Sequence, residues 1–354
     1  MREFGWNRST CLLIDSDSYN LWGNWTDIID KGVFMEGDAA PYAPISTSGK
    51  QSVFKTLQDC FDTAAREGHR SHDLIDWIGY AIGIAWCSKA PKYSTRIEAH
   101  LEEHFPWEDL IRNPSDYLSR FLAENGSSGH LSYYPTPLSI SMAMGMMMDP
   151  NWTDSVLEPC IGPGSIILPL KSLNMVGMDL SLLMVKAACI HSFFYKPQLL
   201  FTPAPILGIH VHPEEQRVHQ YFEFKTDTRI YCGNSLLGEF QAPRKIFEQD
   251  SVFEDIYLHP VRERHKEVYK YQEELKKEWS TMPKALRFKI VQAMAREHSF
   301  DVVLSNPPFS MKLSKFEQET LAEIEKDNIA FSSELKGARA NDVRTYELTQ
   351  LALF

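Results

Sequence analysis

Apolar residues recur with a helical period between Gln51 and about Asn125. They stand three or four residues apart, the spacing that places side chains on one face of an α-helix. Gly68 is a suitable end for the first helix. We therefore predict a mainly helical domain over residues 1–125, whose first fifty residues are mixed and contain one strand-like run at Cys11–Ile14. The apolar positions of the helical pattern are Phe54, Leu57, Phe61, Ala65, Leu74, Ile75, Ile78 and Ile82.

The pattern changes after the Gly- and Ser-rich segment Asn125–Gly129, which is the best linker candidate in the chain. Short apolar runs then alternate with helix-length segments, and each run ends at Gly, Pro, Asn or Asp. This alternation predicts an α/β fold with a parallel sheet joined by crossovers. We predict a second domain over 126–354, with a charged helical insertion at about 241–298. The predicted strands are Val156–Pro159, Met175–Asp179, Arg229–Cys232 and Asp301–Leu304.

The composition is that of an ordinary globular protein. The chain has 354 residues, of which 44% are hydrophobic and 23% charged, and this excludes a wholly disordered or fibrous chain. No apolar run reaches the roughly 18–20 residues that span a bilayer. The first residues lack the apolar core of a signal peptide, so we expect a cytoplasmic protein without membrane contact.

Charge and cysteine content narrow the chemistry further. The formal net charge of −11 implies that any contact with nucleic acid is local. Residues 261–298 hold ten Lys or Arg against six Glu, which suits either phosphate contact or a solvated helix pair. The six cysteines include no CxxC pair, so we expect no zinc site or other metal.

The most informative stretch is an apolar strand that runs directly into Asn306-Pro307-Pro308-Phe309. Two prolines cannot continue a strand ladder, so the chain leaves the sheet in a stiff conformation. The side-chain oxygen of Asn306 and the carbonyl oxygen of Pro307 then form a fixed pair of acceptors, with the Phe309 ring beside them. This set suits a planar NH2 group on a conjugated ring, because accepting both N–H groups frees the nitrogen lone pair. A rigid strand exit without chemistry is the alternative.

This stretch resembles the (Asn/Asp/Ser)-Pro-Pro-(Tyr/Phe) signature of the amino-group methyltransferases that use S-adenosyl-L-methionine. The resemblance implies catalytic roles for Asn306, Pro307, Pro308 and Phe309. Val156–Gly164 looks like the first motif of the same family, a strand that opens into a glycine-bearing loop.

In that first motif, glycines let the backbone approach a ligand, and a following helix N-terminus would offer free N–H groups. The resemblance implies that Pro159, Gly162 and Gly164 line the S-adenosylmethionine site. Glu158 adds a carboxylate suited to the cationic methionine portion of that molecule.

Two further positions match the family's order of motifs. Asp179 stands twenty-one residues after Glu158, close to the spacing of about 20 residues for a carboxylate that binds ribose hydroxyls. A helix N-cap is the plainer alternative for Asp179. After the third predicted strand, Asn234 replaces the Asp that the family often has, and the resemblance implies contact with the adenine amino group.

Upstream, Gly129–Pro137 resembles the segment before the first strand of adenine-specific DNA methyltransferases, commonly Gly-x-Phe/Tyr-Phe/Tyr-Thr-Pro, with Pro135 as an extra residue. This implies that Tyr134, Thr136 and Pro137 lie against the methionine end of the cofactor. A helix over Ile140–Met148 follows, and we expect its methionines in the core.

The order of motifs over Gly129–Phe354 looks most like that of the modification subunits of type I restriction-modification systems, which methylate adenine N6 in DNA. The resemblance implies a Rossmann-like class I methyltransferase sheet, with the Glu158 strand beside the Asn306 strand. It also implies direct in-line methyl transfer to an adenine flipped out of the duplex.

The resemblance leaves three points open. The family's sheet continues past the position of Phe354, so we expect an incomplete sheet, in a fragment or in a chain whose partner completes it. A fold that differs from the family's, with Cys11–Ile14 at a sheet edge, is the third option. Specificity for a DNA site is then expected from a partner such as a specificity subunit. The alternatives are methyl transfer to another amine (cytosine N4, an RNA guanine or a protein glutamine) and a non-catalytic, truncated subunit of a methylase complex.

Overall fold

The computed structural model describes most of the chain up to residue 200 and shorter segments beyond it. The described residues are 21–31, 34, 37–87, 89–126, 133–152, 154–200, 229–235, 300–307, 312–315, 318–319 and 321–322. The predicted strand at Cys11–Ile14 and the predicted insertion at 241–298 lie outside them. The chain divides into two compact units, Met1–Ser310 and Met311–Phe354. In the second unit, Lys315 Nζ and Glu319 Oε1 form an exposed ion pair at 3.7 Å.

Four parallel strands in the first unit form one sheet in the order β3-β2-β1-β4. Each strand falls on a predicted apolar run, so the predicted parallel sheet is confirmed. The chain builds outward from β1 to β3 and then returns to the other side of β1, so the strand order reverses between β1 and β4. Ligands of open α/β sheets bind at such reversals. The strands are β1 (Ser155–Glu158), β2 (Asn174–Asp179), β3 (Ile230–Cys232) and β4 (Val302–Val303).

Hydrogen bonds at both ends of β4 fix its register on β1. The Ser155 N–H and hydroxyl both donate to Asp301 Oδ2, at 2.7 and 2.8 Å, and the Asp301 N–H donates back to Ser155 Oγ at 3.0 Å. These bonds favour the charged carboxylate and lower the pKa of Asp301. At the other end, the Leu304 N–H donates to the Leu157 carbonyl at 3.0 Å. The chain therefore leaves β4 beside the end of β1.

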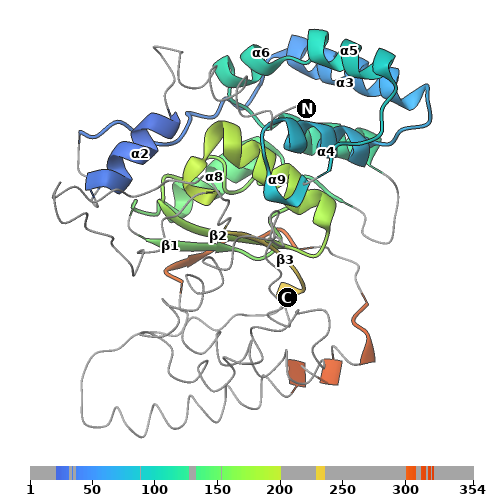
Figure 1. Ribbon diagram of the computed structural model, residues 1–354. Helices are drawn as coiled ribbons and strands as arrows, with labels where there is room; N and C mark the ends of the chain where they lie inside the picture. The colour runs from blue at the N-terminus through green and yellow to red at the C-terminus, as the bar shows by residue number, and fades with distance from the viewer. Residues whose placement is uncertain are drawn as a thin grey trace, which may run out of the picture. The chain divides into compact units, whose positions relative to one another are not determined.

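Helix α9 (Leu182–Tyr195) packs on one face of the sheet, and nearly all of its residues are buried. It contacts β2 and β3 on one side and α4 (Ser71–Ala81) and α6 (Trp107–Arg112) on the other (Figure 1). A helix that is apolar all round is typical of such a position between two layers. The short helix η2 (Pro197–Leu199) follows it and contacts β2.

The predicted helical region is confirmed. Its first helix is followed by a turn in which Gly68 has a φ of 89°, as the sequence suggests. The helices and the sheet share one continuous core, in which Leu57, Ile75 and Val156 are fully buried or nearly so. A domain boundary near residue 125 stays a prediction. The elements besides α4 and α6 are α3 (Gln51–Ala65), η1 (Ala85–Cys87), α5 (Thr95–His104) and α7 (Tyr117–Asn125).

Helix α2 (Leu21–Lys31) is not among the predicted elements, since its segment belongs to the first fifty residues, which are mixed in character. Its apolar residues Trp22, Trp25 and Ile28 are buried. The Trp22 indole N–H donates to the Phe193 carbonyl at 3.0 Å, which attaches α2 to α9. The three-residue spacing of these apolar side chains was the available signal.

Helix α8 (Leu138–Met148) lies at its predicted place, but the expectation that its methionines belong to the core is wrong, since none of them is buried, although Met144 packs against the core. Met146 and Met147 are 77% and 84% exposed. The helix approaches the core at Gly145, where an added Cβ would lie 3.0 Å from Leu170 Cδ2. Because this side faces inward, the residues that follow Gly145 point outward.

The structure is therefore an α/β fold with a mainly helical first part and a small parallel sheet. Within the described parts of the chain, no helix combines the length and apolarity needed to cross a membrane.

Candidate active site

Glu158 ends β1 in the interior, and its side chain is fully buried. Its Oε1 accepts the Cys160 N–H at 3.2 Å, whereas Oε2 has no hydrogen-bond partner among the described residues. Burial raises the pKa of Glu158 to about 8, although the nearby Ser305 hydroxyl and the Cys160 N–H favour the carboxylate. The Ser305 hydroxyl itself has no partner in hydrogen-bonding geometry within the described segments. A buried carboxyl with an unpartnered oxygen is costly unless a ligand donates to it.

The loop after β1 turns on two glycines with positive φ, 52° at Gly162 and 99° at Gly164. Other residues are strained in this conformation. The Ile161 N–H donates to the Met178 carbonyl at 2.7 Å, so the loop lies across the end of β2. Apart from its two chain neighbours, no described residue has an atom within 4 Å of the position that a Cβ on Gly164 would take, which leaves room beside the described residues for a ligand to approach the backbone.

The expected helix directly after this loop is absent among the described residues: 165–169 form turns. One helical-type bond forms, from the Leu168 N–H to the Gly164 carbonyl at 3.0 Å. Pro169 interrupts the segment because it lacks an N–H. Ile166, Ile167 and Leu168 are all buried, so no polar face remains for an amphipathic helix. A helix N-terminus therefore contributes nothing to this site.

Asp179 ends β2, and its carboxylate is held by two backbone groups. Oδ1 accepts the Ser181 N–H at 2.8 Å, and Oδ2 accepts the Gly162 N–H at 2.9 Å. Burial raises the pKa of Asp179, and the two bonds counteract this effect. Ser181 occupies the N-cap position of α9, so the alternative role of Asp179 as that cap is wrong. Each carboxylate oxygen keeps a lone pair for a further donor, such as a diol hydroxyl.

The end of β3 reaches the same edge of the sheet. The Gly233 N–H donates to the Asp179 carbonyl at 2.9 Å, and Asn234 follows as a buried polar residue. The structure thus brings together Glu158, Asp179 and Asn234 at the carboxyl ends of adjacent parallel strands.

Asn306 follows β4 and is joined to a residue far upstream in the sequence. Its Nδ2 donates to Thr136 Oγ1 at 2.9 Å. The amide NH2 group therefore faces Thr136, and Oδ1 makes no hydrogen bond among the described residues and stays available as an acceptor. Pro307 is exposed beside it. Pro308 and Phe309 lie outside the described residues.

The segment before α8 contacts the glycine loop through Tyr133, which is not among the predicted site residues. An added Cβ on Gly162 would lie 3.1 Å from Tyr133 Cε2, so this ring covers the loop. The predicted residue, Tyr134, is 61% exposed. Pro137 stands at the start of α8, and Pro159 lies in the turn after β1. Because Tyr133 and Tyr134 are adjacent residues of the same type, the sequence alone does not indicate which of the two rings faces inward.

No family model, curated protein or solved structure matches this chain.

The chemistry of the site depends on the polar groups that lie at the strand ends. Its polar groups are a buried carboxyl, a second carboxylate at the next strand end, and an asparagine amide oxygen. Among the residues that the structure describes, no group of three or more His, Cys, Asp or Glu side chains could hold a metal ion. A separate surface hollow of about 160 Å³ lies between α3 and α7, where Phe54 and Arg120 are among its lining residues, and no strand-end residue lines it.

Ser305, like Tyr133, lies near the predicted site residues but is not one of them. It lies next to Asn306, and its hydroxyl acts on the pKa of both Glu158 and Cys160. It therefore lies close to the end of β1. Its position directly before the Asn-Pro-Pro stretch, where a strand exit meets a neighbouring strand end, was the available signal.

Proposed function

We propose that the chain is an S-adenosylmethionine-dependent methyltransferase of the Rossmann-like class I type, with adenine N6 of DNA as its acceptor. The observation that carries the proposal is the Asn306–Thr136 hydrogen bond at 2.9 Å. This bond joins Asn306, which the resemblance assigns to the methyl acceptor, to Thr136, which the resemblance assigns to the methyl donor. In addition, β4 lies directly beside β1.

The residues at the strand ends fit the methyl donor. Glu158 Oε2 has no hydrogen-bond partner among the described residues. The cationic amino group of S-adenosylmethionine would donate a hydrogen bond to this oxygen. The two oxygens of Asp179 have the spacing and lone pairs for ribose hydroxyls. The open space beside Gly164 admits a ligand close to the backbone. When bound, S-adenosylmethionine supplies an electrophilic methyl group on a sulfonium.

On this proposal, the chain's own residues act by binding and orientation. Glu158 ionises when a cation pairs with it, because the opposite charge offsets the cost of burial. Asn306 Oδ1 and the Pro307 carbonyl accept the two N–H groups of the target amine and direct its lone pair at the methyl carbon. Thr136 holds the Asn306 amide so that its oxygen, and not its NH2 group, faces the acceptor. Such alignment and hydrogen bonding supply the rate enhancement.

The decisive test is methyl transfer by wild type and by Asn306→Ala. Methyl-labelled S-adenosylmethionine is incubated with duplex DNA, and N6-methyladenine is measured after digestion. We expect Asn306→Ala to lower kcat at least about a hundredfold, with the Kd for the methyl donor unchanged. Asn125→Ala is the matched control, because Asn125 bonds to Gln58 and to the Phe121 carbonyl at the end of α7 and touches no strand end.

Methyl transfer that persists in Asn306→Ala would overturn the role given to Asn306. Transfer to cytosine N4, RNA or a protein glutamine, with none to adenine, would select another acceptor for the same site. Donor binding without transfer to any substrate would favour a non-catalytic subunit of a methylase complex.

A further inference from the structure

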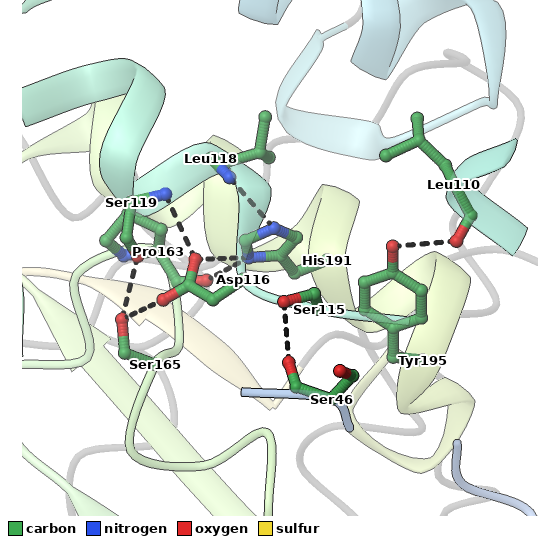
Figure 2. Close-up of polar contacts among 10 residues, drawn as sticks. All are labelled: Ser46, Leu110, Ser115, Asp116, Leu118, Ser119, Pro163, Ser165, His191 and Tyr195. Atoms are coloured by element: carbon green, nitrogen blue, oxygen red, sulfur yellow. Dashed lines mark hydrogen bonds and ion pairs between the residues drawn. The ribbon is translucent and has the colours of Figure 1, made fainter. Parts of the chain in front are cut away.

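A buried polar cluster joins α7, α9 and the glycine loop, and none of its residues belongs to the predicted site (Figure 2). Its central residue is His191 on α9, whose side chain is 2% exposed. The His191 Nε2 accepts the Leu118 N–H at 3.2 Å, so the ring proton is on Nδ1. The Nδ1–H then donates to the Pro163 carbonyl at 2.8 Å. His191 is thus a neutral ring that holds the carbonyl between Gly162 and Gly164.

Asp116 holds the next residue of the same loop. It is the N-cap of α7, where its Oδ1 accepts the Ser119 N–H at 3.0 Å. Its Oδ2 accepts the Ser165 hydroxyl, and the Ser165 and Ser119 hydroxyl oxygens are 2.7 Å apart. Asp116 Oδ1 also lies 3.8 Å from His191 Nδ1. The two side chains therefore act on neighbouring groups of one loop, the Pro163 carbonyl and the Ser165 hydroxyl.

The opposite side of the loop is held by Asp179 of the predicted site and by a bond within the loop itself. The Gly162 N–H is bonded to Asp179, and the Gly164 N–H to the Ile161 carbonyl at 2.8 Å. Two glycines with positive φ give this loop several accessible conformations. Anchors on both sides select one of them. An apolar cluster of the same volume would pack as well or better, but it would leave the direction of the Pro163 carbonyl undetermined.

We propose that Asp116 and His191 are positioning residues that fix the glycine loop in the shape that binds S-adenosylmethionine. The inference rests on the proposed function. It gives the helical part of the chain a role in donor binding, because Asp116 belongs to α7 and the loop it holds belongs to the sheet. Neither residue is proposed to touch the donor.

The test compares donor binding in paired variants by titration calorimetry with S-adenosylmethionine and S-adenosylhomocysteine. We expect Ser165→Ala and His191→Leu to raise the Kd about tenfold or more, since misplacing a binding group costs this much. His191→Gln keeps one donor and one acceptor on a side chain of similar length, so it should recover most of the affinity. Steady-state transfer should show a raised KM for the donor with a smaller change in kcat.

Two variants control for the loss of a polar bond elsewhere in the same layer. Tyr195→Phe removes the bond from the Tyr195 hydroxyl to the Leu110 carbonyl at 2.9 Å, also on α9. Ser115→Ala removes the bond from the Ser115 hydroxyl to the Ser46 carbonyl at 2.7 Å, next to Asp116. Both bonds are shown in Figure 2, and neither reaches the loop. We expect wild-type donor affinity from both variants.

The outcomes separate the two proposals. Wild-type protein that binds the donor while Ser165→Ala and His191→Leu bind it equally well overturns the positioning role and leaves the proposed function intact. Equal losses in Tyr195→Phe and Ser115→Ala also overturn it, because the effect would then be general destabilisation. Wild-type protein that binds neither ligand overturns the proposed function and this inference with it. Should His191→Leu fail to fold, Ser165→Ala decides, since it removes a single hydroxyl.

Discussion

At the scale of single residues, Glu158 combines complete burial with an oxygen that has no hydrogen-bond partner in the described part of the chain. A protein optimised for stability alone would not keep such a group, because an isolated buried carboxyl is destabilising whenever it ionises. On the proposed function, the cationic methyl donor offsets this cost when it binds.

We predict that Glu158 makes a contribution to wild-type stability that falls between pH 5 and pH 8, and that Glu158→Gln removes this contribution. Burial raises the folded-state pKa from 4.5 to about 8, so the folded protein binds this proton more tightly than the unfolded chain does. The contribution is complete below the unfolded pKa and is lost as the pH rises through the folded one. The upper limit is roughly 4–5 kcal/mol at pH 8. Urea midpoints of both proteins at several pH values measure it.

Glu158→Gln should also weaken binding of the methyl donor, since the amide carries no charge for the cationic amino group. Higher stability at pH 8 with lower affinity is the expected combination. A pH dependence equal in wild type and variant would contradict the prediction.

The residue scale also shows where sequence reading succeeds and where it stops. Asn306 was predicted because two prolines after an apolar strand fix its place locally. His191 was not, because its partners Leu118 and Pro163 lie 73 and 28 residues away in the sequence. His191 lies within an almost wholly buried helix. The neighbouring sequence does not indicate whether such a histidine makes specific hydrogen bonds or only packs in the core.

At the scale of elements, the glycine loop packs on β2 at Gly177. A Cβ at this position would lie 2.1 Å from Ile161 Cδ1. The strand therefore needs a residue without a side chain where the loop crosses it. The strands themselves were predictable from their apolar runs, whereas the turns at 165–169 were not, since an apolar segment of this length also suits a helix.

We predict that Gly177→Ala destabilises the protein by about 1–3 kcal/mol through overpacking, and that Ile161→Val partly restores it. Valine lacks the Cδ1 atom that the new Cβ meets. Ile161→Val alone should cost about 0.5–1.5 kcal/mol. Chemical unfolding of the two single variants and the double variant gives the coupling. Additive effects would show that the loop does not press on β2.

At the scale of the whole molecule, buried residues of α3, α4, α9 and β1 belong to one core. Helices and sheet are therefore expected to unfold together in one cooperative transition, as small connected cores usually do. The sequence indicated helices and strands separately, but it could not indicate that they share a core, because that depends on which faces meet.

We predict that Leu57→Ala on α3 lowers the unfolding free energy by about 2–5 kcal/mol and lowers it equally for the sheet. Hydrogen exchange in increasing urea, followed on peptides from α3 and from β1–β2, measures both. Lys55→Ala is the control, since Lys55 is exposed on the same helix. A shift confined to the α3 peptides would mean that the two parts unfold independently.

The hydrogen bond between Asn306 and Thr136 spans 170 residues of sequence. On the ribosome, Thr136 emerges long before Asn306, so this hydrogen bond can form only after the intervening segments are made. The strand that carries Asn306 enters beside β1, next to a strand that was synthesised much earlier. A translation product that stops before residue 300 would contain the sequence of the loop and the helices yet lack Asn306, the residue that the proposed function assigns to the acceptor amine.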